Sequence, residues 1–249
     1  MTPFVGKIAR RFAIVDLPSE RKVHIAPIPR IGGVALFIAF FLSLVLFSFN
    51  KYMLRELIGQ EHRVPVFVIG AALIFALGLW DDIRRLPSSA KFAGQIGVAT
   101  LLYFGGFQIH AVSLPFVSSF QLGVFALPVT IFWFVLVINA INLIDGLDGL
   151  AAGISLFVSI TMMVTCLANN RLLEALCFAS LSGALLGFLR YNFNPASIFM
   201  GDCGSYFLGY VLAALSLLGS IKGQFATAML IPVIALGIPL MDTLWAPVR

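Results

Sequence analysis

Two adjacent aspartates, Asp81 and Asp82, stand at the end of a long apolar segment and are candidates for cation binding or acid–base chemistry. Adjacent carboxylates repel each other, so a bound cation or a proton on one of them is favoured. A divalent metal would satisfy both charges, and a carboxylate with an altered pKa could also act as a general base. A double aspartate alone is weak evidence, so its neighbours in the fold matter.

Four amide and carboxylate side chains recur at intervals of three, at Asn139, Asn142, Asp145 and Asp148. Neighbours at this spacing lie on adjacent parts of one helical face. The asparagines should face the protein interior, because lipid offers an amide no hydrogen-bond partner. The glycines that begin at Gly146 predict a tight turn that lets backbone approach a ligand. An ordinary turn between two helices is the alternative, whereas the ligand spacing of an EF-hand is missing.

A third group surrounds Asp202, which lies between Gly201 and Gly204 shortly before another apolar segment. Backbone N–H groups at a helix N-terminus attract anions through unsatisfied donors and the helix dipole. Asp202 suits such a place if a cation bridges it to a bound phosphate. Its alternative role is that of a helix cap.

A basic stretch precedes the first apolar segment and contains Lys22, His24 and Arg30, followed by Gly32 and Gly33. These cations could grip phosphates while the glycine pair lets backbone come close. The alternative is a solvated arm that is attracted to anionic lipid.

The elements that must position these residues are apolar helices in a membrane. Hydrophobic residues make up 60% of the chain and charged residues 11%, with a mean hydropathy of +1.02, whereas soluble domains carry about 25% charged residues. We expect an all-α fold, a polytopic integral membrane helical bundle that forms a single domain over 1–249. A basic loop at 1–30 precedes about eight transmembrane helices within 31–245. Their expected ranges are 31–49, 64–80, 92–107, 123–142, 150–168, 172–189, 205–219 and 226–245.

The distribution of charge predicts which ends of these helices face the cytoplasm. Eleven of the sixteen lysines and arginines fall on the side of the N-terminal segment, and the positive-inside rule makes that side cytoplasmic. Eight of the eleven acidic residues fall there too, against Glu56, Glu61 and Glu174 on the other side. The basic residues lie in short loops between apolar segments, so they indicate membrane orientation and not nucleic-acid binding. The segment 108–122 reads as either a short hairpin or an interfacial loop.

Motif loops near 81–91, 143–149 and 190–204 therefore meet at one membrane face. The positive N-terminal ends of the first, third, fifth and seventh helices should converge there as well. Carboxylates, amides, cations and helix N-termini in one place describe a site for Mg²⁺ and phosphates, since Mg²⁺ is held by one or two carboxylates and completed by phosphate oxygens and water.

The motifs together resemble the polyprenyl-phosphate N-acetylhexosamine-1-phosphate transferases, glycosyltransferase family 4. The resemblance rests on the Arg-Lys-x-His and Pro-Arg-Ile-Gly-Gly motifs, the double aspartate, the Asn-x-x-Asn-x-x-Asp-Gly-Leu-Asp-Gly-Leu-Ala motif and Phe-Met-Gly-Asp-x-Gly-Ser, in that order over nearly the whole chain. The Pro-Arg-Ile-Gly-Gly form is more similar to undecaprenyl-phosphate N-acetylglucosamine-1-phosphate transferases of polysaccharide or teichoic-acid pathways. The peptidoglycan branch, which transfers phospho-N-acetylmuramoyl-pentapeptide, usually has Thr-Pro-Thr-Met-Gly-Gly there.

The resemblance implies a reaction in which undecaprenyl phosphate attacks a UDP-N-acetylhexosamine and UMP is released. It implies a catalytic group of Asp81, Asp82 and Asp145, with Asp81 as the base. Asp202 and Asn142 would bind Mg²⁺, for which Mn²⁺ is a possible substitute. Substrate contacts would come from Lys22, His24, Arg30, Gly146, Leu147, Asp148 and Phe199. The implied location is the bacterial inner membrane, with the site facing the cytoplasm, membrane lipid and a possible homodimer partner around it, and no nucleic acid.

Family members usually carry one more helix before the Arg-Lys-x-His motif, and a histidine-bearing loop with further helices after Asp242. An inactive truncated copy is therefore one alternative reading.

Proteins of two other classes also carry acidic residues in membrane helices. A transporter would place ionisable groups at mid-membrane or on both faces. A CDP-alcohol phosphatidyltransferase would have an Asp-Gly-x-x-Ala-Arg pattern, but here Ala151 and Ala152 follow Gly149-Leu150 without an arginine.

Overall fold

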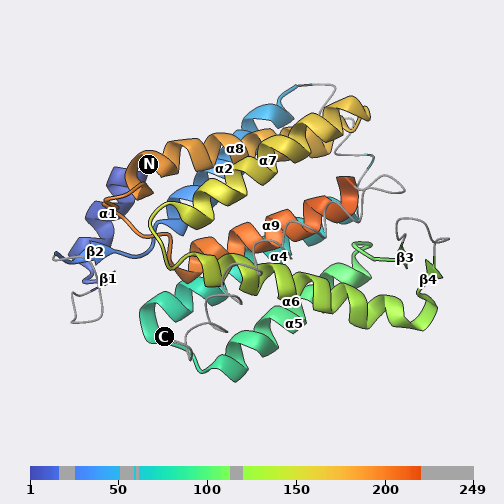
Figure 1. The fold of residues 1–249 in the computed structure, drawn as a ribbon, viewed down its shortest axis with the longest axis horizontal. Helices are drawn as coiled ribbons and strands as arrows, with labels where there is room; N and C mark the ends of the chain where they lie inside the picture. Colours follow the sequence, from blue (N-terminus) through green and yellow to red (C-terminus); the bar gives the residue numbers. More distant parts are fainter. Residues whose placement is uncertain (17–25, 51–58, 60–61, 113–119, 220–249) are drawn as a thin grey trace, which may run out of the picture.

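The protein is a bundle of apolar helices, as expected (Figure 1). The computed structural model describes residues 1–16, 26–50, 59, 62–112 and 120–219. The expected helix at 226–245 lies outside these residues. Within them the helices are α1 (Thr2–Arg11), α2 (Gly33–Ser48), α4 (Arg63–Arg84), α5 (Ser88–Phe104), α6 (Ala126–Ile144), α7 (Leu150–Ala168), α8 (Leu172–Asn192) and α9 (Gly201–Gly219), and a 3-10 turn, η1 (Gly123–Phe125), leads into α6.

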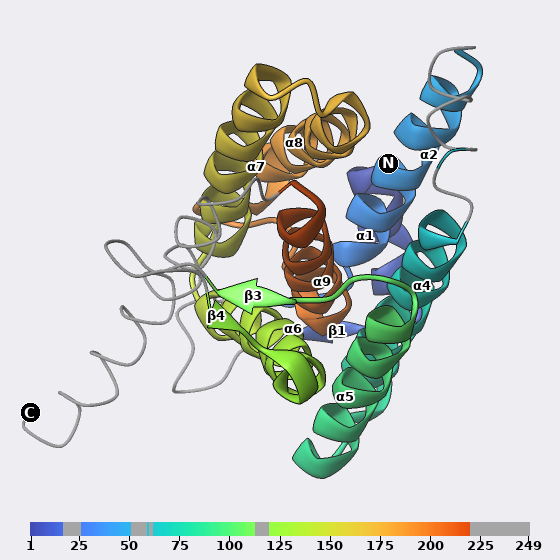
Figure 2. The same cartoon turned by 90° about the vertical axis from the view of Figure 1, so that its right-hand side faces the viewer.

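Helix α9 forms the centre of the bundle. It packs along α4 and α6 and also contacts α2, α7 and α8, which surround it in the view along the bundle (Figure 2). Of the residues in the most apolar stretch of α9, 78% are buried inside the protein, whereas the corresponding share for α4 is 33%. The first turn of α9, which carries Asp202, is therefore held in place by helices from every side.

Five helices in the described part of the chain are long and apolar enough to cross a membrane: α4, η1 with α6, α7, α8 and α9. Helix α2 is apolar but has 16 residues, and α5 has 17, so at about 1.5 Å per residue both fall short of a hydrocarbon core about 30 Å thick. The chain is thus a multi-pass membrane protein, with two of the expected spans shorter than a full crossing.

The helix ends differ from the expected ranges at two places that matter for the site. Helix α4 continues to Arg84, so Asp81 and Asp82 lie in its last turns and not in a loop after it. Helix α9 begins at Gly201, four residues earlier than expected, which places Asp202 in its first turn. Both shifts bring carboxylates onto rigid elements.

Two short antiparallel pairs of strands stand at opposite ends of the bundle (Figure 1). Strand β1 (Val15–Asp16) pairs with β2 (Ile28–Pro29), near α1. Strand β3 (Ala111–Val112) pairs with β4 (Phe120–Gln121), which decides between the alternatives for 108–122 in favour of a hairpin.

The segment 1–30 was expected to be a loop, but its first residues form helix α1. A proline in the first turn and basic residues in the last turn both favour a helix there. Val5 and Ala9 are buried, and the helix contacts α2, α8 and β2. The expectation treated the segment as basic and polar, and missed that its apolar residues recur at helical spacing.

Glycines let α4 approach α9 closely. A Cβ atom added to Gly78 would lie 2.5 Å from the carbonyl oxygen of Asp202. We expect Gly78→Ala to destabilise the protein by about 1–3 kcal/mol, because the two helices must separate or deform. Thermal unfolding in detergent measures this. Gly153→Ala is the matched control, since nothing lies within 4 Å of its added Cβ; an equal loss in both variants would contradict the packing argument.

Candidate active site

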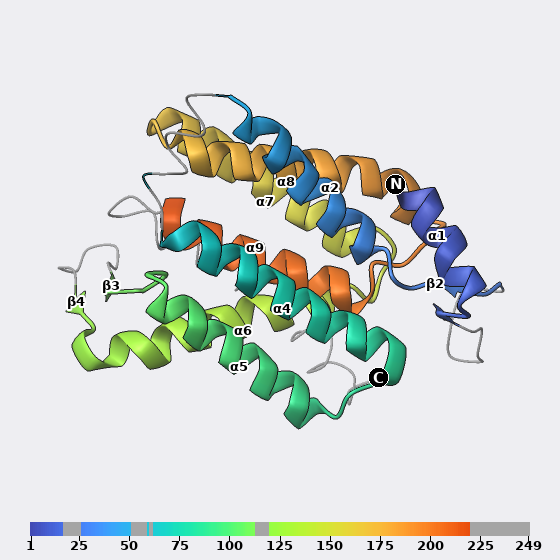
Figure 3. The same cartoon turned by 180° about the vertical axis from the view of Figure 1, so that it is seen from behind.

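Helix ends from distant parts of the chain meet at one end of the bundle and bring the sequence motifs together (Figure 3). Helices running in opposite directions alternate along the chain, so N-termini and C-termini mix at this end. The N-terminal ends are those of α2, α5, α7 and α9, and the C-terminal ends are those of α4, α6 and α8. The expected convergence of motifs is therefore observed.

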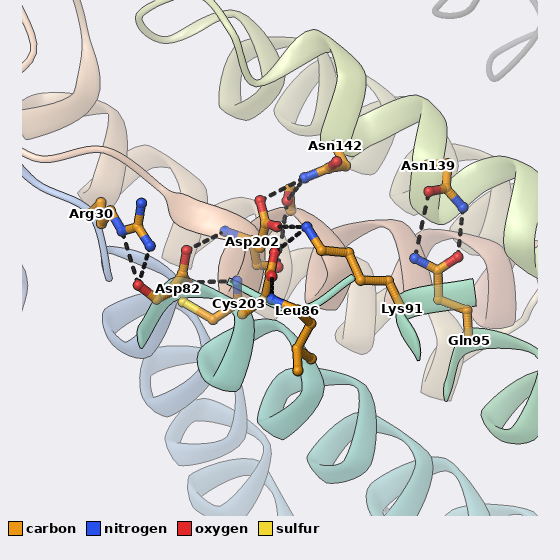
Figure 4. A network of polar contacts seen from close by, with 11 residues as sticks. Arg30, Asp82, Leu86, Lys91, Gln95, Asn139, Asn142, Asp202 and Cys203 are labelled. Carbon is orange, nitrogen blue, oxygen red and sulfur yellow. Dashed lines mark hydrogen bonds and ion pairs between the residues drawn. The ribbon is translucent and has the colours of Figure 1, made fainter. Parts of the chain in front are cut away.

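The ammonium group of Lys91 contacts two of the aspartates, and Figure 4 shows it beside Asp202. It forms an ion pair with Asp81 Oδ2, and its Nζ atom is 3.2 Å from Asp202 Oδ2. Asp81 Oδ1 also accepts a hydrogen bond of 2.6 Å from the backbone N–H of Leu86. One cation thus bridges two carboxylates, which come from α4 and α9.

Asp82 caps helix α9 from α4. Its two carboxylate oxygens accept hydrogen bonds from the backbone N–H groups of Asp202 (2.9 Å) and Cys203 (3.0 Å), both in the first turn of α9 (Figure 4). A carboxylate at this position satisfies orphan donors and the positive end of the helix dipole. The cap role that was one reading of Asp202 therefore belongs to Asp82, and Asp202 is left to face the cluster.

The basic motif is joined to the α9 motif through backbone. The N–H of Phe199 donates to the Pro29 carbonyl, and the N–H groups of Gly32 and Gly33 donate to the carbonyls of Phe199 and Met200, at 2.7–2.9 Å. A Cβ on Gly33 would collide with the backbone of Gly204 in α9, so glycine is required at this crossing.

Arg30 is held over the end of α4 by the same segment. Its guanidinium donates to the main-chain carbonyl of Asp82, with an Nε distance of 3.0 Å. This bond fixes one edge of the guanidinium beside the carboxylate cluster, where an arginine is suited to contact a phosphate.

Amide side chains of α6 support the cluster from the opposite side. Asn142 Nδ2 lies 2.9 Å from both Asp202 Oδ1 and Ser205 Oγ. One turn earlier, Asn139 Nδ2 donates to Gln95 Oε1 at 2.6 Å, which links α6 to α5 (Figure 4). Both asparagines face the protein interior, as expected. Asn142 acts here as a donor that orients Asp202, and ligation of a metal through its oxygen stays a prediction.

Asp145 follows the end of α6 and completes the negative cluster. Burial, together with the negative charges of Asp202 and Asp82, raises the pKa of Asp145 well above its usual range, although the backbone N–H of Gly201 donates to it and lowers the pKa in part. A cation in the cluster would oppose this shift by favouring the charged carboxylate.

Asp148 organises the loop between α8 and α9. Its Oδ2 atom accepts hydrogen bonds from Asn194 Nδ2 (3.2 Å) and from the backbone N–H of Ala196 (2.9 Å). The preceding residues Gly146 and Leu147 are exposed, with 68% of Leu147 accessible. The turn predicted from the glycines is present, and Gly149 takes a positive φ of 73° at the start of α7.

Comparison with known proteins identifies the family. The model of glycosyl transferase family 4 matches residues 64–220. The chain is 42% identical over its whole length to a probable undecaprenyl-phosphate N-acetylglucosaminyl 1-phosphate transferase of Bacillus subtilis, covering 67% of that protein. This chain belongs to glycosyl transferase family 4.

Other members of glycosyl transferase family 4 are similar over most of the chain. The decaprenyl-phosphate N-acetylglucosaminephosphotransferase of Mycolicibacterium smegmatis is 36% identical, with all of this chain and 66% of the relative covered. A phospho-N-acetylmuramoyl-pentapeptide-transferase of Listeria welshimeri is 35% identical over 87% of this chain and 68% of its own length. The chain spans about two thirds of the length of these family members.

Some site residues of this family 4 member were found only in the structure. Lys91 and Gln95 were given no role in the predicted site; their spacing of four at the start of an apolar helix was the available signal. Ser205 belonged to a quoted motif without a role. The predicted substrate residues Lys22 and His24 lie outside the described residues.

The fit of a divalent metal can be judged from the donor set. Within the described ranges, no three His, Cys, Asp or Glu side chains form a ready metal cluster. Mg²⁺, however, commonly takes only one or two protein carboxylates. Asp81 and Asp202 already hold one cationic group between them, so the hard oxygen donors that Mg²⁺ needs are present and face one point.

Proposed function

We propose that this chain carries the catalytic core of a polyprenyl-phosphate hexosamine-1-phosphate transferase. In this proposal it transfers N-acetylglucosamine-1-phosphate from a UDP-sugar to undecaprenyl phosphate and releases UMP, as the first membrane step of a cell-envelope polysaccharide or teichoic-acid pathway. The observation that carries it is the meeting of Asp81 and Asp202 around one cation at the end of the bundle. Two anionic phosphates can meet only where positive charge offsets their repulsion.

The reaction exchanges one phosphorus–oxygen bond for another. An oxygen of the lipid phosphate attacks the sugar-linked phosphorus of the UDP-sugar, and the bond from that phosphorus to the bridging oxygen breaks as UMP leaves. Asp81 would take up the remaining proton of the lipid phosphate, and Lys91 would stabilise the negative charge on the phosphates. Asp82 would position Asp202 by holding the first turn of α9.

Mg²⁺, or Mn²⁺ in its place, would be held by Asp202 and Asn142, with Asp81 facing the same point, and would supply charge neutralisation for the phosphates when bound. Asn142 would keep the Asp202 carboxylate oriented through its 2.9 Å hydrogen bond. Asp145 would add to the negative field that attracts the cation.

The UDP-sugar would bind beside the α8–α9 loop. Asp148 ties this loop to the start of α7, and the exposed Gly146-Leu147 backbone offers hydrogen-bonding groups to a uridine. Phe199 and Arg30 stand on the two paired segments and would contact the nucleotide and its phosphates. Lys22 and His24 are proposed to add further phosphate contacts.

The transfer assay tests the proposal directly. Membranes containing the chain, radiolabelled UDP-N-acetylglucosamine, undecaprenyl phosphate and Mg²⁺ should release UMP and form labelled lipid. A panel of donors that includes UDP-N-acetylmuramoyl-pentapeptide separates transfer of N-acetylglucosamine-1-phosphate from transfer of phospho-N-acetylmuramoyl-pentapeptide. The second activity is the alternative that the similarity to the Listeria welshimeri protein supports. Absence of transfer with every donor would refute the enzymatic proposal.

The site is proposed to face the cytoplasm of a bacterial inner membrane. The described residues at this end include Lys7, Arg30, Arg84, Arg85 and Arg190, whereas Arg63 and Arg171 lie at the other end, and cytoplasmic ends carry the excess of basic residues.

Thiol labelling checks this orientation. In a chain with its native cysteines replaced by alanine, Leu147→Cys should resist an impermeant thiol reagent applied to intact cells. Val124→Cys is the matched control at the other end of the bundle; its side chain is 87% exposed and should react. The reverse pattern would show that the site faces outward.

A further inference from the structure

Helix α1 carries three separate stripes of side chains. Thr2, Val5 and Ala9 are buried against the bundle, and Gly6 faces Ile198 of the α8–α9 loop. A second stripe is apolar and exposed, and a third is basic and exposed. Members of each stripe recur at intervals of three or four and so share one face of the helix.

The exposed apolar stripe consists of Met1, Phe4, Ile8 and Phe12. Their accessible fractions are 56%, 67%, 36% and 69%. Four large apolar side chains along a short helix and its two capping residues form an exposed patch of the kind that marks a contact with lipid or protein.

The basic stripe consists of Lys7, Arg10 and Arg11, all of which are exposed. The first fifteen residues contain no aspartate or glutamate, and none of these three cations has an ion pair with a residue that the structure describes. The charge of this stripe is complementary to an anionic surface, and its place beside the apolar stripe matches the boundary between acyl chains and phosphates in a bilayer.

The depth of α1 along the bundle agrees with that boundary. It lies at the same end as the last turns of α4 and α8 (Figures 1 and 3). Exposed Trp80 and Tyr191 stand near those helix ends, and such amphipathic aromatic rings favour the headgroup level of a membrane.

We infer that α1 is an interfacial helix that lies on an anionic lipid surface beside the catalytic cluster. Its apolar stripe enters the boundary of the acyl chains, and its basic stripe contacts the lipid phosphates. By packing on α2, on α8 and against Ile198, it couples the membrane surface to the loop that precedes Asp202. This inference goes beyond the transfer reaction and does not depend on it.

Spin labels on the whole chain in nanodiscs test the insertion. The native cysteines are replaced by alanine, and a nitroxide is placed at Phe4→Cys or Ile8→Cys on the apolar stripe, or at Lys7→Cys on the basic stripe. In bilayers of phosphatidylglycerol and phosphatidylcholine, oxygen should reach the labels at positions 4 and 8 better than a water-soluble nickel complex does. The label at position 7 should show the reverse preference. Equal nickel access at all three positions would overturn the inference.

Two other outcomes would also overturn it. Poor access of both reagents to positions 4 and 8 would show that protein covers the stripe. Close distances between spin labels in separate copies would show that the cover is a second copy of the chain.

Charge variants test the preference for anionic lipid. With the label at position 4, oxygen access should be higher in bilayers that contain phosphatidylglycerol than in bilayers without it. The double variant Lys7→Gln and Arg10→Gln should lose this difference in access, whereas the double variant Lys7→Arg and Arg10→Lys should keep it. The matched control pair, Arg84→Gln and Arg85→Gln, removes two exposed charges from the same end of the bundle and should also keep it. If the Lys7→Gln and Arg10→Gln variant kept the difference in access, a role for the basic stripe would be contradicted.

Discussion

Asp202→Asn should lower sugar-phosphate transfer about a thousandfold or more, a loss of the size seen when a preorganised electrostatic group is removed. The variant keeps the shape of the side chain and can still meet Asn142. It removes the negative charge that Lys91 now contacts at 3.2 Å and that a divalent cation would need. The measurement is the initial rate of radiolabelled lipid formation in membranes with equal amounts of protein.

Glu174→Gln provides the control for this variant. Glu174 is also a buried acid, but it lies near the start of α8 at the far end of the bundle, where it pairs with Arg171 at 3.4 Å. Its neutralisation should leave transfer close to the parent rate. Near-parent turnover of the Asp202 variant would remove this residue from the mechanism, and equal losses in both variants would indicate a general structural effect.

Lys91→Met should lower turnover about a hundredfold, the scale at which single charge-stabilising groups act in such sites. Methionine preserves much of the side-chain length and apolar volume but offers no charge to Asp81 or Asp202. The same change should strengthen Mg²⁺ binding, because the ammonium occupies the point between the two carboxylates where the metal would lie.

The opposite signs of these two effects make the Lys91 prediction specific. Turnover is measured by the transfer assay at saturating Mg²⁺, and Mg²⁺ affinity by the rise of thermal stability with metal concentration, since a ligand that binds only the folded state stabilises it. Lys91→Arg keeps the charge and should keep the weaker metal affinity. Weaker Mg²⁺ binding in Lys91→Met would show that the lysine organises the carboxylates and does not compete with the metal.

The division of labour between Asp81 and Asp82 follows from their contacts. Both belong to the last turns of α4, one residue apart and therefore about 100° apart around the helix. Asp82 points to the N-terminus of α9 and uses both carboxylate oxygens there. Asp81 instead contacts Lys91 and the backbone N–H of Leu86. Identical residue types thus take a structural role and a proposed chemical one.

The sequence by itself determined the class of protein and the ingredients of the site. Apolar stretches of about 20 residues predicted membrane helices, and five of the described helices meet that length. Alternation of helix direction predicted that motifs far apart in the chain meet at one end. The motifs predicted glycosyl transferase family 4, which the comparisons confirm. These properties depend on local composition and order, so they can be read without knowing any long-range contact.

Only the tertiary structure decided which side chains face each other. The bridge formed by Lys91 joins residues more than one hundred positions apart, and the cap that Asp82 places on α9 spans 120 positions. A pattern along one helix sets the direction of a side chain relative to its own axis, but the rotation and crossing of neighbouring helices set its partners. Close approach at Gly33 and Gly78 fixed those crossings here, and with them the difference between a carboxylate that caps a helix and one that is proposed to bind a metal.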